Sequence, residues 1–227
     1  MWLSVAFMII GQMGAEIGVS QSMGRGDREG AKRYAQNAFF LALVLGILFG
    51  LAMVLFRQPL VGFFGIQDPE VARQTEAYLL IVALAIPLNF LSAVAVGSFN
   101  ASGNSRIPFI VNAVGLVFNM VLDPLMILSF GWGIEGAAIA TVLSQVVTFT
   151  LMLLALKRAK NRPFEAIKIF VRPKMLYIRQ ILRWSIPIGL ESMFFTLLSM
   201  ITTRLVAGFG TQAMAVSRVG SQIESLT

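Results

Sequence analysis

The sequence predicts an all-α integral membrane protein, a polytopic helical bundle with six spans and a truncated seventh. Of its 227 residues, 57% are hydrophobic and only 13% are charged, whereas soluble domains average about 45–50% and about 25%. The mean hydropathy is +0.79. The apolar residues gather in runs of the length, about 20 residues, that a helix needs to cross ~30 Å of hydrocarbon.

Six runs have this length, and turn-forming residues separate the first five. The runs are residues 1–20, 39–56, 78–96, 108–130, 134–156 and 185–209, and a seventh begins near Gln212. The intervening turns are GRGDREG, GIQDPE, NASGNSRIP and GWGIEG. Glycine and proline mark such turns, and in the second turn Asp68 and Pro69 suit the N-cap and first position of a helix.

The fifth run is followed by a long polar linker, residues 157–183. Its later part, KMLYIRQILRW, places four aliphatic residues among basic ones: Leu176, Ile178, Ile181 and Leu182. Apolar and basic residues alternating in this way predict an amphipathic helix that lies on the membrane surface.

The net charge is +7, and the distribution of Lys and Arg predicts orientation rather than nucleic-acid binding. Most of the 18 basic residues fall in the first, third and fifth loops. Those loops are therefore expected to be cytoplasmic, so the first run starts outside. Because no basic residue precedes Arg25, we expect a helix before residue 1 and a chain that is a fragment at both ends.

The absence of Cys and His excludes disulfides, thiolate nucleophiles, haem attachment and most transition-metal sites. No nucleophile–base pair is visible, so an enzyme is not expected, and no cofactor is implied.

The stretch NMVLDPLMI, residues 119–127, places a carboxylate and a proline inside an apolar run. Asp123 is 15 residues beyond Pro108, about 22 Å along a helix, which puts it roughly 10 Å inside the outer boundary. A charge at that depth is costly and typical of a functional site. The alternative, an acid that reaches water at the helix end, stays open.

Pro124 is expected to bend the helix and to free the carbonyl of Met120, because proline has no N–H. A carboxylate beside a loose carbonyl predicts a cation site, and the bend predicts a hinge. Pro87 is expected to kink the third run in the same way.

Three polar residues lie at a depth similar to that of Asp123. Asn119 is one turn away on the same face, Tyr78 is near the outer end of the third run, and Thr141 is about 10 Å inside the outer end of the fifth. An anchoring role for Tyr78 and a backbone hydrogen bond for Thr141 are the alternatives.

Other polar and small residues in the runs have structural explanations. Asn112 is expected to join helices. Glu16 and Glu191 lie near cytoplasmic ends, where they can reach the interface and pair with basic residues, so we interpret them as structural or gating groups. The glycines of the first run allow close helix packing; they are Gly11, Gly14 and Gly18.

Four stretches resemble the multidrug and toxic compound extrusion (MATE) transporters. GVSQSMGRGDREGAKRYAQNA is similar to their first cytoplasmic loop, SFNASGNSRIPFIVNAVGLVFNMVLDPLMI to the fourth loop and fifth helix, GIEGAAIATVLSQ to the sixth helix and IPIGLESMF to the seventh. Asn-x-x-x-Asp-Pro combined with Gly-Ala-Ala-x-Ala-Thr is the most specific part of this resemblance.

The resemblance implies one half of a twelve-helix transporter with two lobes. Residues 1–156 would be the N-terminal lobe without its first helix, residues 157–183 the cytoplasmic linker, and residues 184–227 the start of the C-terminal lobe. The cation site of the DNA-damage-inducible branch falls on Asp123, Asn119, Tyr78 and Thr141. The acid of helix one is missing, and the corresponding place on helix seven, near Thr202, carries no acid.

The implied activity is an antiporter, coupled to H⁺ or Na⁺, that exports lipophilic and cationic drugs across the inner membrane by alternating access. We expect a monomer in the lipid bilayer that does not transport as this half alone. Two alternatives remain. A lipid-linked oligosaccharide flippase would need Arg or Lys in the cavity, and a non-transporting scaffold would have an Asp123 that is indifferent to ions.

Overall fold

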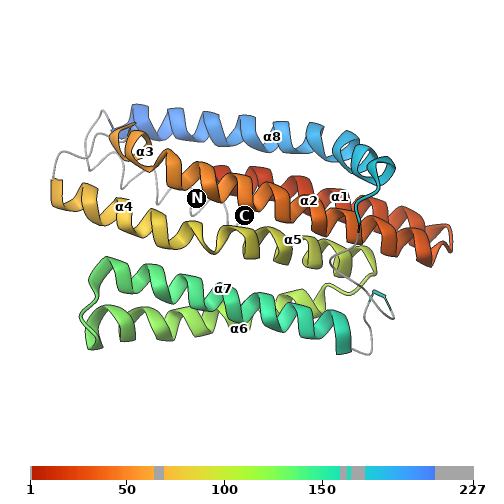
Figure 1. The fold of residues 1–227 in the computed structure, drawn as a ribbon, viewed down its shortest axis with the longest axis horizontal. Helices are drawn as coiled ribbons and strands as arrows, with labels where there is room; N and C mark the ends of the chain where they lie inside the picture. Colours follow the sequence, from red (N-terminus) through yellow and green to blue (C-terminus); the bar gives the residue numbers. More distant parts are fainter. Residues whose placement is uncertain (1, 64–68, 159–162, 165–171, 208–227) are drawn as a thin grey trace.

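A computed structural model describes residues 2–63, 69–158, 163–164 and 172–207 (Figure 1). No β-strand occurs within these ranges, so the predicted all-α class is confirmed. The elements are α1 (Trp2–Gly24), α2 (Arg28–Leu55), α3 (Arg57–Phe63), α4 (Pro69–Ala83), α5 (Ile86–Ala101), α6 (Arg106–Pro124), the π-helix η1 (Leu125–Ser129), α7 (Gly133–Arg158) and α8 (Met175–Ala207). The predicted seventh span and Asp68 lie outside the described residues.

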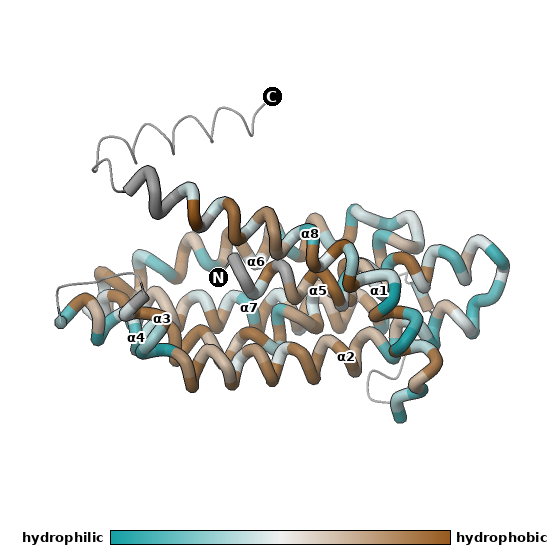
Figure 2. Tube along the Cα trace, turned by 90° about the horizontal axis from the view of Figure 1, so that it is seen from above, coloured by the Kyte–Doolittle hydropathy of each residue, from teal (hydrophilic) through white to brown (hydrophobic). Residues whose placement is uncertain are grey.

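Several helices have the length and composition to cross a membrane. Four spans qualify in the described part of the chain: α2, α6 continued by η1, α7 and α8. The bent pair α4–α5 makes a fifth if it counts as one span. Figure 2 shows hydrophobic residues along the middle of the helices and hydrophilic ones toward the two ends. The exact number of spans stays a prediction.

The helices form two packed groups. In the first, α1 lies against α2, α5 and α8, and α2 also packs on α5. In the second, α6 and η1 pack on α7, which in turn contacts α4 and α5 (Figure 1). Phe39, Phe90, Phe99 and Ile181 are among the large side chains that are buried completely in the core.

Glycines permit the close packing of α1, as predicted. A Cβ at Gly14 would overlap the side chain of Ile181 on α8, and one at Gly18 would lie 2.6 Å from the ring of Tyr34 on α2. On α5, a Cβ at Gly97 would lie 2.6 Å from the backbone oxygen of Gln12. The backbones of α1 and α5 therefore approach each other more closely than any side chain would allow.

The predicted bend at Pro87 is confirmed. The helices α4 and α5 meet at an angle of 48° across a short break, and Pro87 is the second residue of α5. Two glycines of α2 face this bend: a Cβ at Gly46 would lie 2.8 Å from Pro87 Cα, and one at Gly50 would lie 3.1 Å from the oxygen of Ala83. The sequence GILFG thus makes room for the broken helix.

The amphipathic stretch of the linker differs from its prediction. It is helical, but it forms the first turns of α8 and continues into the sixth predicted span without a break. Ile181 is fully buried against α1, whereas Leu176 is exposed, so this stretch packs in part on protein. The Tyr34 hydroxyl donates a hydrogen bond to Gln180 Oε1, and the Tyr34 ring packs on Trp184.

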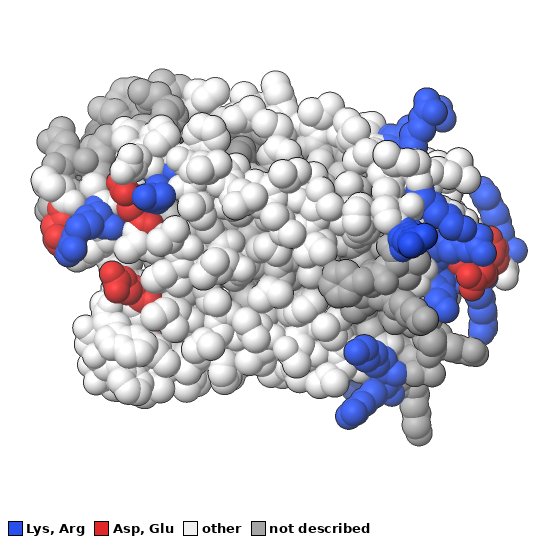
Figure 3. All heavy atoms as spheres, in the orientation of Figure 1, with Lys and Arg blue, Asp and Glu red and all other residues white. Residues whose placement is uncertain are grey.

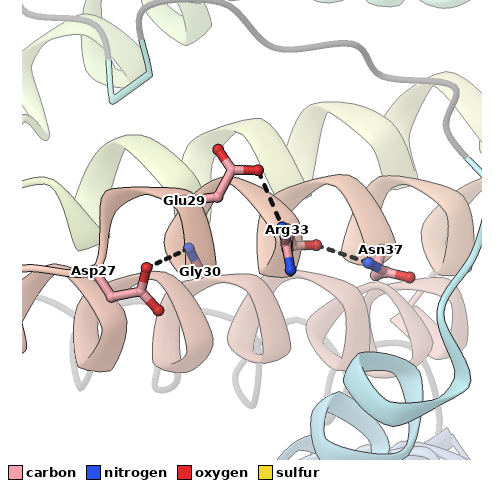
Figure 4. A network of polar contacts seen from close by, with 5 residues as sticks. All are labelled: Asp27, Glu29, Gly30, Arg33 and Asn37. Atoms are coloured by element: carbon pink, nitrogen blue, oxygen red, sulfur yellow. Dashed lines mark hydrogen bonds and ion pairs between the residues drawn. The ribbon is translucent and has the colours of Figure 1, made fainter.

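A polar network at the start of α2 forms a hydrogen bond with the backbone just before α8. Asp27 caps α2 by accepting a hydrogen bond of 2.8 Å from the Gly30 N–H, and Asn37 donates to the Arg33 carbonyl oxygen over 2.8 Å (Figure 4). Asn37 Oδ1 also accepts a 2.7 Å hydrogen bond from the Lys174 N–H. The backbone just before α8 is therefore fixed to α2.

Candidate functional site

Asp123 lies on α6, six residues before the end of η1. Its side chain is half-buried, and Asn119 Nδ2 donates a 3.2 Å hydrogen bond to its Oδ1. Asn119, one turn earlier on the same face, is half-buried as well. No ion pair involving Asp123 occurs in the part of the chain that the structure describes. The carboxylate therefore keeps acceptor capacity for a proton or a small cation.

The helix changes its winding directly after this carboxylate. Pro124 ends α6 because it has no N–H to donate to the Met120 carbonyl, and residues 125–129 continue as a π-helix. Leu125 N–H bonds to the Leu122 oxygen, and Phe130 N–H bonds to the Leu125 oxygen over 3.1 Å. The segment after Pro124 is thus wound more widely and stays part of one candidate span, Arg106–Ser129; the hinge role of Pro124 stays a prediction. Such π-turns are frequent at functional sites, but no sequence signal identified this one.

Two close contacts fix the register between α6–η1 and the antiparallel helix α7. A Cβ at Gly136 would lie 2.8 Å from the Met126 oxygen, and one at Gly115 would overlap the hydroxyl of Thr148. Interpolation between these contacts places Thr141 at a level between Asn119 and Asp123. The depth match that the sequence predicted for Thr141 therefore follows from the packing as well.

The Thr141 hydroxyl is engaged within its own helix. It donates a 2.9 Å hydrogen bond to the Ala137 carbonyl oxygen, which is the alternative role that the sequence left open. A hydroxyl in this state can still accept a hydrogen bond or coordinate a cation through its second lone pair.

Tyr78 on α4 lies at about the same level along the bundle as Thr141 on α7. Arg73 on α4 lies near enough to Glu135 on α7 for their charges to interact, and both helices start at the same end of the molecule (Figure 1). Tyr78 is five residues beyond Arg73, and Thr141 is six beyond Glu135. Tyr78 is half-buried. Within the described ranges, no hydrogen bond joins it or Thr141 to Asp123, so the four-residue site stays a prediction.

The two ends of the molecule differ in charge. Figure 3 shows most Lys and Arg gathered at the end where α2, α6 and α8 begin, called the basic end, and acidic side chains beside fewer basic ones at the other, called the acidic end. The α6–η1 span runs from the basic end to the acidic one, so Asp123 is nearer the acidic end, roughly 9 Å from the end of η1. Among the described residues, no group of three or more Asp or Glu suitable for a metal ion is present.

The remaining polar candidates differ in their surroundings. Asn112 and Glu191 are exposed, whereas Glu16 is half-buried on α1. The predicted pairing of the two glutamates with basic residues is not found in the described part of the structure, where the ion pairs are Arg33–Glu29, Arg57–Glu76 and Arg73–Glu70.

Comparison with known proteins indicates the family to which this chain belongs. The sequence profile of the MatE family matches residues 1–125. The probable multidrug resistance protein YpnP of Bacillus subtilis is 34% identical over 236 residues, covering 97% of this chain and 50% of that protein. The probable multidrug resistance protein NorM of Thermotoga maritima is 28% identical over 231 residues, covering 100% and 49%.

Solved structures agree with this assignment. A MOP superfamily transporter from Pyrococcus furiosus superposes with a TM-score of 0.84 at 25% identity, over 99% of this chain and 50% of that one. A MATE transporter in the bent conformation gives 0.85 at 25% identity, with the same coverage. The chain spans about half the length of the relatives that it matches. It belongs to the MatE family, whose members are membrane transporters and not enzymes.

Proposed function

We propose that the full-length protein is a cation-coupled antiporter that exports lipophilic and cationic compounds by alternating access, with Asp123 as the coupling carboxylate. The observation that carries this proposal is the half-buried Asp123, held by Asn119 beside the π-helix and without a basic partner among the described residues. The names of its relatives support drug export as the activity.

Asp123 would bind H⁺ or Na⁺ that enters from the acidic end. Asn119 would position the carboxylate, because its amide donates to one oxygen and leaves the other for the ion. Thr141 and Tyr78, at the same level on α7 and α4, would complete the site if the helices move together by a small amount. Neutralising the carboxylate removes its attraction for nearby dipoles, and the π-helix after Pro124 offers a segment that can rewind in response.

The same proposal includes the orientation of the protein in the membrane and its oligomeric state. The basic end would face the cytoplasm, as Lys and Arg do in short loops, in the inner membrane of a bacterium. The full-length protein would act as a monomer in the bilayer without nucleic acid. In the helices before the linker, Lys and Arg lie only in the first or last two turns. This distribution disfavours the flippase alternative, which needs basic groups in its cavity.

The test is ion-driven efflux by the full-length protein carrying Asp123→Asn. We expect the substitution to abolish export driven by a proton or sodium gradient while the membrane level of the protein is unchanged. Glu135→Gln is the matched control, because Glu135 is an exposed acid near the same end of the molecule. Normal export by Asp123→Asn at normal protein level would refute the role of Asp123.

The unfolding midpoint, measured as the Na⁺ or proton concentration is raised, distinguishes the transporter from a non-transporting scaffold. Na⁺ or protons should raise the unfolding midpoint of the wild-type protein, since a ligand that binds the native state stabilises it. The same titration should leave the Asp123→Asn variant unaffected. An unfolding midpoint that is equally insensitive in both proteins would favour a carboxylate with a purely structural role.

A further inference from the structure

Glu16 is a second membrane-depth acid with an environment unlike that of Asp123. It lies on α1, eight residues before the end of that helix at Gly24, which places it roughly 12 Å from the basic end of the molecule. Asp123 lies nearer the acidic end. Each half of the bundle therefore carries a half-buried acid that has no ion-pair partner among the described residues.

One oxygen of the Glu16 carboxyl is sealed from solvent. Its Oε2 is buried and has no hydrogen-bond partner in the described residues. The contact between α1 and α5 explains this burial, because the Gly97 backbone approaches Gln12, one turn before Glu16 on the same face. The polar neighbour of the carboxyl across this interface is the Asn100 side chain on α5.

No positive charge compensates Glu16 from the helices that pack on α1. The helix α5 has no titratable residue. The side of α2 that meets α1 presents Tyr34 at Gly18, and the side of α8 presents Ile181 and Ser185 at Gly14. No charged side chain of the described residues lies near enough to act on the carboxyl. An ionised carboxylate with a buried, unpaired oxygen is costly, and protonation removes that charge. The Asn100 side chain can donate a hydrogen bond to the carboxyl in either state.

We propose that Glu16 is a second proton-binding site of this transporter, one that exchanges its proton with the basic end of the molecule. This inference rests on the proposed antiporter function for its role, but not for the proton binding itself. The proton binds to the carboxylate, whose Oε2 is sealed from solvent, and Asn100 acts as a positioning residue. The close contact between α1 and α5 keeps water from Oε2 in this conformation, so the proton exchanges when the two helices separate and water reaches that oxygen.

The direct test is infrared spectroscopy of the purified full-length protein during a pH titration, which reports the C=O stretch of protonated carboxyl groups. We expect Glu16→Gln to remove one protonated-carboxyl band and Asn100→Ala to shift the same band. Glu191→Gln is the matched control, because Glu191 is an exposed glutamate within α8, and it should leave the band unchanged. A Glu16→Gln spectrum identical to wild type at every pH would overturn the proposal.

Glutamine is a neutral isostere of a protonated glutamic acid, so the variant should also fold. Failure of Glu16→Gln to accumulate as folded protein, while Glu191→Gln accumulates normally, would mean that the charged form is required and would equally overturn the proposal.

Transport measurements separate this inference from the proposed function. With a proton gradient across proteoliposomes, Glu16→Gln should lose gradient-driven export but retain substrate binding. If the band of Glu16 is present while Asp123→Asn exports normally, proton binding at Glu16 stands and the assigned role of Asp123 fails. If Asp123→Asn abolishes export and the band is absent from wild type, the proposed function stands and Glu16 is not a proton site.

Discussion

The α1–α2–α5–α8 group and the α6–η1–α7 group differ in how tightly they are packed. In α5, ten of 16 residues are buried, whereas α6 buries three of 19 and η1 none. Glycines allow close backbone contacts in both groups, at Gly97 in the first and at Gly136 in the second. The difference in burial shows that α6 and η1 are joined to the rest of the described structure through fewer buried residues than α5, and Asp123 lies on this more loosely joined segment. Under the proposed function, Asp123 therefore lies where fewer buried contacts oppose a movement of its helix.

The exposed residues of the second group agree with this difference in burial. Large apolar side chains of α6 are largely exposed: Phe109, Leu116, Val117, Met120 and Val121. In a membrane these faces contact lipid or other protein segments, which exchange neighbours more easily than an interlocked core does. Glu16 lies on α1, one turn after the close contact between Gln12 and Gly97, so any conformational change that opens the α1–α5 contact would act on it directly.

The largest predicted effect comes from adding one methyl group to the tight contact. Gly97→Ala would place Cβ against the Gln12 backbone oxygen, which cannot move without the whole of α1. Overpacking of this kind costs about 3 kcal/mol, more than the roughly 1 kcal/mol that alanine adds in helix propensity. We expect a marked drop in the thermal unfolding midpoint of the full-length protein.

The matched control is Gly24→Ala, at the end of α1, where a Cβ would have no neighbour within 4 Å. This variant should unfold at or slightly above the wild-type midpoint. Equal midpoints for the two variants would contradict a rigid α1–α5 contact.

An intermediate effect is expected at the junction between α2 and the start of α8. Asn37→Ala removes the acceptor of the Lys174 N–H and the donor to the Arg33 oxygen, a loss of about 1 kcal/mol. The control is Asn112→Ala, since Asn112 is an exposed asparagine within α6 and the gain in helix propensity is the same. Thermal unfolding should separate the two, and a larger effect of Asn112→Ala would contradict the assigned contact.

The smallest change in the free energy of unfolding is expected when a methyl group is added between α6 and α7. Gly115→Ala would meet the Thr148 side chain, which can rotate away at the loss of its 2.8 Å hydrogen bond to the Ser144 oxygen. The expected net change is about 0.5 kcal/mol, because the gain in helix propensity offsets most of the strain.

A double-mutant cycle with Thr148→Ala sharpens this result. Removing the hydroxyl should make Gly115→Ala neutral or stabilising, with a coupling energy of about 1 kcal/mol. A cost as large as that of Gly97→Ala would mean that the two helix groups are equally rigid.

Local chemistry accounts for what could be predicted from single residues. The bend at Pro87 follows from the missing N–H of proline, and the turns follow from Gly26, Gly103, Gly131 and Gly133, all of which have positive φ. The hydrogen bond between Asn119 and Asp123 follows from a spacing of four in a helix.

Contacts between distant segments could not be predicted in this way. The role of Gly97 depends on which helix lies opposite it, and the seating of Gln180 and Trp184 on Tyr34 joins residues that are far apart in the sequence. The amphipathic start of α8 has the same pattern whether it lies on lipid or on protein. Only packing distinguishes the two, because periodicity reports that a face is buried and not what covers it.

The sequence by itself determined the all-α class, the break between α4 and α5, and an acid within an apolar helix, because hydropathy, proline geometry and helical periodicity are local properties of the chain. The tertiary structure alone decided which acid keeps a polar partner and which has a sealed oxygen, where the span after Pro124 becomes a π-helix, and which helices bury most of their residues. These features depend on distances between backbones, which the order of residues does not contain.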